Sequence, residues 1–128
     1  MTRILQTTPV FTVADVAVTM HWYQDHLGFH GDAVPRNPPH NFAILRRDDI
    51  EIMLQRLDGY QKPDLYQQRP GGIWNVYLRT DGVRALYERV SSDDAIQIVE
   101  PLHVQPYGQM EFVVQDPNGY TLVFAEPA

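Results

Sequence analysis

The stretch QMEFVVQDPNGYTLVF, residues 109–124, decides the fold of this chain. Two apolar runs flank Asp116-Pro117-Asn118-Gly119, a pattern that is typical of two strands joined by a turn. Pro117 presets φ at about −65°, Asp116 can accept hydrogen bonds from the amides ahead of it, and Gly119 tolerates the positive φ that reverses the chain. Residues 110–115 and 120–125 are therefore predicted to form the last two strands.

The residues before this hairpin predict a strand, a helix and another strand. The strands are expected at 73–79 and 96–100. The helix lies between them, and its apolar stripe consists of Val83, Leu86, Tyr87 and Val90. The C-terminal half thus has the order β-α-β-β-β.

The N-terminal half shows the same order of elements. A helix is expected at 16–27, because Asp15 can cap its N-terminus, its apolar residues recur on one face and Gly28 can end it. Strands are expected at 7–13, 29–34, 42–46 and 50–55.

A unit of strand, Asp and amphipathic helix therefore recurs after about 65 residues. The sequence predicts one α+β domain over residues 1–128, with module one at about 1–57, a linker rich in proline and glycine at 58–72, and module two at about 73–128. The alternative is a generic α+β domain whose internal similarity is accidental.

Composition limits the classes of function. The chain has 128 residues, of which 44% are hydrophobic and 20% charged, as expected of a folded domain. Its net charge of -6 and the lack of Lys and Arg clusters argue against binding to nucleic acid. The absence of cysteine excludes disulfides and thiolate metal sites. No signal peptide or membrane span is recognisable, so we expect a cytoplasmic protein that does not bind membranes.

Two segments resemble a known family. Residues 9–16, PVFTVADV, and 22–29, WYQDHLGF, resemble the first module of the vicinal oxygen chelate superfamily, which includes glyoxalases, bleomycin resistance proteins and dioxygenases. Residues 109–124 are similar to the family's final hairpin. The resemblance covers nearly the whole chain and is greatest to the bleomycin-resistance-like members. It implies two βαβββ modules, each with four strands curled into a half-open cup, helices outside and a ligand cleft inside.

The family pattern also predicts whether a metal is held. Metal-using members place His or Gln on the first strand of each module and Glu on the last strand of each. Counting from the helix caps and the turns, the matching positions here are Thr8, Asn75, Glu51 and Val123. Only Glu51 is a good ligand, so we expect no metal and no other cofactor. No catalytic motif is recognisable, and no catalytic residue is assigned.

Strand alternation predicts which side chains face the cleft. The expected ligand-binding residues are Thr12, Glu51, Met53, Asn75, Tyr77, Arg79 and Val123. Tyr77 and Met53 could instead complete a core, and the facing of residues 110–115 stays open. A flat ring beside a carboxylate favours an aromatic or cationic ligand, unless Arg79 neutralises Glu51 and shifts the preference to neutral or anionic compounds.

The resemblance therefore implies a homodimeric protein that sequesters a small molecule, such as a drug, without transforming it. Trp22 and Trp74 are expected to contribute to the dimer interface. The alternatives are a metal-dependent lyase or isomerase of the glyoxalase type or a ring-cleaving dioxygenase, against which Val123 argues. A third possibility is an accessory protein without a ligand.

Overall fold

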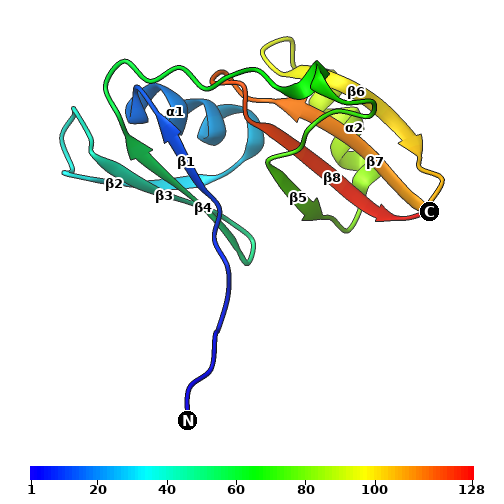
Figure 1. The fold of residues 1–128 in the computed structure, drawn as a ribbon, viewed down its shortest axis with the longest axis horizontal. Coiled ribbons are helices and arrows are strands. Elements are labelled where there is room, and N and C mark those ends of the chain that lie inside the picture. The colour runs from blue at the N-terminus through cyan, green and yellow to red at the C-terminus, as the bar shows by residue number, and fades with distance from the viewer. The chain divides into compact units, whose positions relative to one another are not determined.

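A computed structural model describes all residues from 1 to 128. The chain forms two compact units, Met1–Gln61 and Lys62–Ala128. Each unit has one four-stranded open sheet and one long helix, as Figure 1 shows. The predicted α+β class and the two βαβββ modules are confirmed.

The first unit contains β1 (Val10–Val13), α1 (Val16–Leu27), β2 (His30–Val34), β3 (Phe42–Arg47) and β4 (Ile50–Arg56). Its strand order is β1-β4-β3-β2, and β1 runs parallel to β4 while the other pairs are antiparallel. Helix α1 has the predicted bounds. Asp15 accepts a hydrogen bond from the Val18 amide at 3.0 Å, and Gly28 ends the helix with a φ of 69°.

The core of the first unit lies between α1 and one face of its sheet. Alternate residues of the strands face the helix, where they meet the apolar stripe of α1. The buried hydrophobic residues of these two layers are Phe11, Val13, Ala43, Leu45, Ile52 and Leu54 from the sheet, and Val16, Met20, Tyr23 and Leu27 from the helix. We call the other side of each sheet, which faces away from the helix, its open face.

The second unit contains η1 (Tyr66–Gln68), β5 (Val76–Arg79), α2 (Val83–Ser91), β6 (Gln97–Val104), β7 (Gln109–Gln115) and β8 (Thr121–Pro127). Its strand order, β5-β8-β7-β6, repeats that of the first unit, with β5 parallel to β8. Phe112 is fully buried, stacking on Phe124 at 5.1 Å between ring centres and meeting the edge of Tyr87 from α2 at 5.0 Å. Residues Phe112 and Val114 therefore face α2, which decides the facing of β7.

The predicted turn between β7 and β8 is confirmed. Asp116 accepts hydrogen bonds from the amides of Asn118 at 2.8 Å and Tyr120 at 2.9 Å, and Gly119 has a φ of 92°. These bonds satisfy amides that the turn would otherwise leave without partners. The turn sets the register in which Phe112 lies opposite Phe124.

Several element bounds differ from the predictions. β6 was expected at residues 96–100, yet it continues past Pro101 to Val104. Its pairing with β7 shifts register around Glu100 and His103, and such irregularities are where a strand tolerates proline. Helix α2 has Gly82 at its N-cap, and the carboxylate of Glu126 accepts from the Val83 amide at 2.9 Å, in place of a local cap. None of the helices has the length and apolar character that a membrane crossing needs.

Candidate functional site

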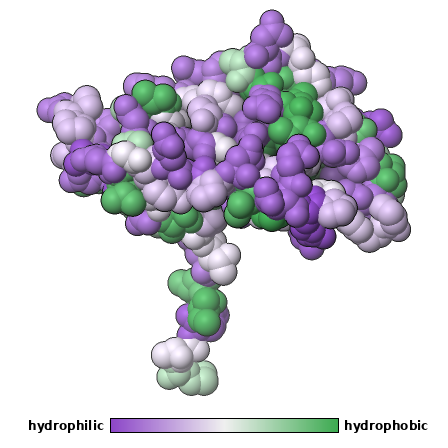
Figure 2. Space-filling view, turned by 45° about the horizontal axis from the view of Figure 1, so that its top comes forward, coloured by the Kyte–Doolittle hydropathy of each residue, from purple (hydrophilic) through white to green (hydrophobic).

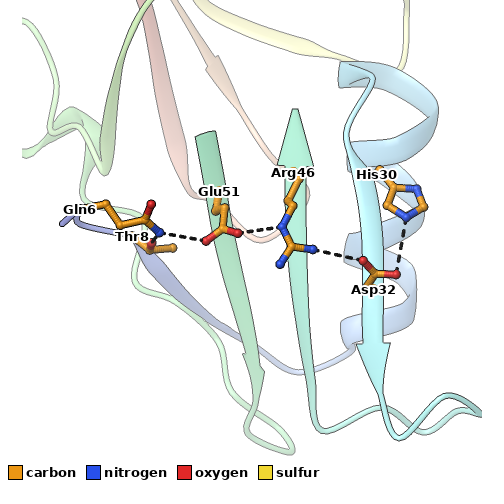
Figure 3. Close-up of polar contacts among 6 residues, drawn as sticks. All are labelled: Gln6, Thr8, His30, Asp32, Arg46 and Glu51. Atoms are coloured by element: carbon orange, nitrogen blue, oxygen red, sulfur yellow. Dashed lines mark hydrogen bonds and ion pairs between the residues drawn. The ribbon is translucent and has the colours of Figure 1, made fainter. Parts of the chain in front are cut away.

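The open face of the first unit carries a chain of polar side chains (Figure 3). Arg46 of β3 donates to Glu51 of β4 at 2.7 Å and to Asp32 of β2 at 3.2 Å. His30 lies 3.5 Å from Asp32, and Gln6 donates to Glu51 at 3.2 Å. Arg46 and Glu51 are direct partners in the strand register, so the sheet itself brings them together. The charges of this face are paired with one another.

The other predicted ligand-binding residues of this unit, Thr12 and Met53, lie beside these polar side chains. The Thr12 hydroxyl accepts from the Gln55 side chain at 2.9 Å, and Met53 is partly buried between these groups. The sequence left open whether Arg79 neutralises Glu51, and in the structure Arg46 has this role. This face is therefore polar and partly exposed, and its arginine is shared by two carboxylates.

The open face of the second unit is aromatic and aliphatic. Trp74 and Tyr77 lie 5.6 Å apart between ring centres. They pack with Val99 against a cluster of buried residues, Tyr66, Val113 and Val123. Val123 is fully buried there, so the position that metal-using relatives fill with Glu forms part of an apolar floor. The two units thus share a topology but differ in the chemistry of their open faces.

Tyr66 reaches this floor from the segment 62–72, which we call the strap. Asp64 accepts from the Tyr66 amide at 3.2 Å and starts the short helix η1. Tyr66 is 8% exposed, and its ring lies against Gly72, where an added Cβ would clash with it. The sequence predicted a linker or surface loop here, and the structure shows that the strap packs Tyr66 onto the sheet.

Two polar atoms of this cluster are buried without a hydrogen-bond partner, the Tyr66 hydroxyl and the Trp74 indole Nε1. Such groups are rare in folded proteins because each loses its bonds to water and gains nothing in return. Burial, followed by the nearby charge of Glu100, raises the pKa of the Tyr66 phenol above its usual value. Beside Tyr66 is a pocket of about 410 Å³, lined by Tyr66, Gln67, Gln68, Arg69, Pro70, Gly71, Gly72, Val99 and Glu100.

Glu111 of β7 is the buried charged group of this face. Its carboxylate is 0% exposed and accepts hydrogen bonds from the hydroxyl of Tyr77, from the hydroxyl of Tyr107 at 2.7 Å and from Gln105 at 3.2 Å. Burial, then the hydrogen bond and charge of Glu111, raise the pKa of Tyr77 to about 12, although Arg79 opposes the shift. The same causes raise the pKa of Tyr107. Both phenols therefore stay protonated at neutral pH and act as donors to Glu111.

The remaining predicted ligand-binding residues, Asn75 and Arg79, lie at the two ends of β5, which we call its rim. The Asn75 side-chain oxygen accepts from the amide of Thr121 at 2.9 Å, so it ties the start of β5 to β8. Arg79 is exposed, and its guanidinium carbon lies 5.9 Å from the centre of the Tyr77 ring. Tyr77 is thus flanked by Trp74, Glu111 and Arg79.

Comparison with known proteins shows the family. Residues 3–124 match the sequence model of the Glyoxalase/Bleomycin resistance protein/Dioxygenase superfamily. The chain belongs to this superfamily. Comparison with curated protein sequences gives no match.

Several solved structures share the fold. The chain is similar to TioX from Micromonospora sp. ML1, with 20% identity, a TM-score of 0.75 and coverage of 97% of this chain and 99% of that one. A glyoxalase-related enzyme from Clostridium phytofermentans has 19% identity, a TM-score of 0.75 and coverage of 99% and 98%. The bleomycin-binding protein of bleomycin-producing Streptomyces verticillus, complexed with copper(II)-bleomycin, has 26% identity, a TM-score of 0.68 and coverage of 97% of both chains.

The residues at the superfamily's metal positions do not fit a divalent ion. Glu51 is engaged by Arg46, the oxygen of Asn75 is engaged by Thr121, and Val123 has no donor atom. No group of three or more His, Asp or Glu side chains converges anywhere in the chain. Divalent catalytic ions need several such ligands around one point. These residues therefore do not support a metal-dependent step.

Four residues of this site were not predicted from sequence as ligand-binding residues. They are Trp74, which was expected at a dimer interface, and Glu111, Tyr107 and Tyr66. A signal existed for Glu111, because it is the single charged residue of β7 and the other residues between the two terminal glutamines of that strand are apolar. Such a residue is buried only when it has partners, which predicts a polar cluster. No comparable signal marks Tyr66, whose contacts depend on how the strap folds.

Proposed function

We propose that the chain is a small-molecule-binding protein of the bleomycin-resistance type, which captures an aromatic compound on the open face of its second unit and does not transform it. The observation that carries this proposal is the aromatic pair Trp74 and Tyr77 beside two buried donors without partners. Aromatic pairs stack on planar ligands, and a few well-placed polar groups orient what is bound. A ligand with acceptor atoms would satisfy the Trp74 indole.

Tyr66 occupies the place where such a ligand would lie. The strap is held at its start by Lys62, which lies 5.3 Å from the centre of the Tyr120 ring. At its other end Gly71 and Gly72 have φ values of 83° and 86°, a conformation in which glycine is nearly unstrained. Binding would lift the Tyr66 ring from Val123, and the pocket beside Tyr66 provides the path inward. Asn75 and Arg79 would contact the ligand from the rim.

The first unit has a smaller part in this proposal. Thr12, Glu51 and Met53 lie on an open face whose charges are already paired, so a ligand gains less there. The solved relatives support binding as the function, since two of the similar structures are bleomycin-binding proteins with bleomycin bound. A glyoxalase-type lyase or a dioxygenase is less well supported, because the metal positions do not fit an ion.

Titration of aromatic compounds with tryptophan fluorescence tests the proposal. In a Trp22→Phe background, Trp74 is the only tryptophan and reports on the site directly. Tyr77→Ala should weaken binding by about 1 kcal/mol, which is about fivefold in Kd, because a ring contact is lost. Trp22→Phe alone should leave Kd unchanged in calorimetry. A panel in which no aromatic compound binds, or in which Tyr77→Ala has no effect on any hit, would overturn the proposal.

We also propose a cytoplasmic homodimer. Residues 1–9 continue from β1 as an extended arm, and Figure 2 shows hydrophobic residues along it. Ile4 and Leu5 in this arm are 95% and 79% exposed. Exposed apolar side chains of this size are stabilised when a partner chain covers them. Light scattering should give twice the mass of one chain, and a monomer at micromolar concentration would contradict the dimer.

A further inference from the structure

Glu111 differs from the other carboxylates with structural roles in the chain. Glu51 pairs with Arg46, Glu126 caps α2 and Asp116 forms the last turn. Glu111 is fully buried, and its three donors, from Tyr77, Tyr107 and Gln105, are all uncharged. A carboxylate buried without a cation loses hydration that neutral hydrogen bonds only partly replace. Its negative potential is therefore available to a positively charged ligand.

The two oxygens of Glu111 are held differently. Oε2 accepts from Tyr77, which belongs to the sheet, whereas Oε1 accepts from Tyr107 and Gln105 of the turn between β6 and β7. Tyr107 is 55% exposed, and its hydroxyl reaches the buried carboxylate of Glu111. The turn is closed by the hydrogen bond from the Gly108 amide to the Gln105 carbonyl at 2.9 Å. Tyr107 can thus leave Oε1 by a side-chain rotation that does not disturb Tyr77.

We propose that Glu111 is the cation-recognition group of this site. The ammonium or amidinium of an aromatic ligand replaces the Tyr107 hydroxyl at Oε1, while the ring of the ligand packs against Tyr77 and Trp74. This inference rests on the proposed function and names the class of ligand, a primary aryl-alkylamine or an aryl amidine. The Tyr107 hydroxyl is a neutral donor, so an ammonium in its place adds the attraction between opposite charges to the hydrogen bond, which favours the replacement.

Arg79 disfavours a cationic ligand, because its positively charged guanidinium also lies near Tyr77. Its side chain is exposed, so water and salt screen its charge. Glu111 is buried, and buried charges are screened much less. At the Tyr77 ring the negative charge of Glu111 therefore outweighs the positive charge of Arg79, which favours a cationic ligand.

Three naphthalene derivatives with the same ring test the proposal. They are 2-naphthylmethylamine, which is cationic at neutral pH, 2-naphthylmethanol, which is neutral, and 2-naphthoate, which is anionic. Calorimetry should show that the wild-type chain binds the amine about tenfold more tightly than the alcohol, and the anion most weakly. Glu111→Gln should abolish the preference for the amine. Glu88→Gln, which removes a carboxylate from the exposed side of α2, should keep it.

Tyr107→Phe provides a second variant that does not depend on how well Glu111→Gln folds. It removes the competing hydroxyl at an exposed position, so it should tighten binding of the amine by a few-fold and leave the alcohol unchanged. Equal effects on the amine and the alcohol, or a wild-type chain that does not distinguish them, would overturn the cation assignment. If all three compounds bind equally and Tyr77→Ala weakens each of them, the proposed function stands and this inference fails. If none binds, both fail.

Discussion

Two substitutions that each remove one phenolic hydroxyl should have opposite effects on stability. The hydroxyl of Tyr66 is buried and has no partner, whereas that of Tyr77 donates to the buried carboxylate of Glu111. Tyr66→Phe therefore removes a group whose burial costs about 1 to 3 kcal/mol. We expect stabilisation near the lower end, about 1 kcal/mol, because the strap lies at the surface of its unit.

Tyr77→Phe removes the hydroxyl that donates to Oε2 of Glu111 and leaves this oxygen without that hydrogen bond. Hydrogen bonds to charged groups contribute about 1.5 to 3 kcal/mol, so the free energy of unfolding should fall by about 2 kcal/mol. The two variants should then differ by about 3 kcal/mol although the chemical change is the same. In a domain of 128 residues, 1 kcal/mol shifts Tm by about 3 to 5 °C.

Urea unfolding followed by circular dichroism measures both variants against the wild type, with thermal unfolding as a second measurement. Equal slopes of free energy against urea would show that only stability has changed. The reasoning about the orphan hydroxyl would be refuted if Tyr66→Phe destabilised the chain by 1 kcal/mol or more. Equal destabilisation by both variants would show that the two hydroxyls have equivalent partners.

Three further outcomes are expected. Gly72→Ala places a Cβ against the Tyr66 ring at a φ of 86°, so it should displace the strap and speed proteolytic cleavage within residues 62–72. Gly59→Ala is the control, because a Cβ at Gly59 meets nothing within 4 Å, and it should not change the rate of cleavage. Because the pKa of Tyr77 is raised from 10.0 to about 12, the contribution of its hydroxyl to stability is present below pH 10 and is lost as the pH rises toward 12. This part of the pH dependence of Tm should be absent in Tyr77→Phe. Elemental analysis after dialysis should find no stoichiometric divalent metal, since the donor set at the family's metal positions is incomplete, and one equivalent of zinc, nickel, iron or manganese would contradict this.

Local chemistry made the elements of the fold predictable. The bounds of α1 follow from Asp15 and Gly28, and the last turn follows from Asp116 and Gly119. Each of these signals acts within a few residues, through a hydrogen bond to a nearby amide or a φ that only glycine adopts easily. The ends of β6 were less predictable, because pairing with β7 carried the strand past Pro101.

The sequence by itself determined the class of fold, the repeat of its modules and the lack of a metal-binding donor at Val123, since these depend on residue type and spacing along the chain. Only the tertiary structure decided which groups meet. Arg46 faces Glu51 through strand register, Tyr77 reaches Glu111 from 34 residues away, and the strap brings Tyr66 onto the sheet. These contacts join segments distant in sequence, and they form because burying the apolar surface of one segment against another outweighs the entropy lost in closing the chain between them.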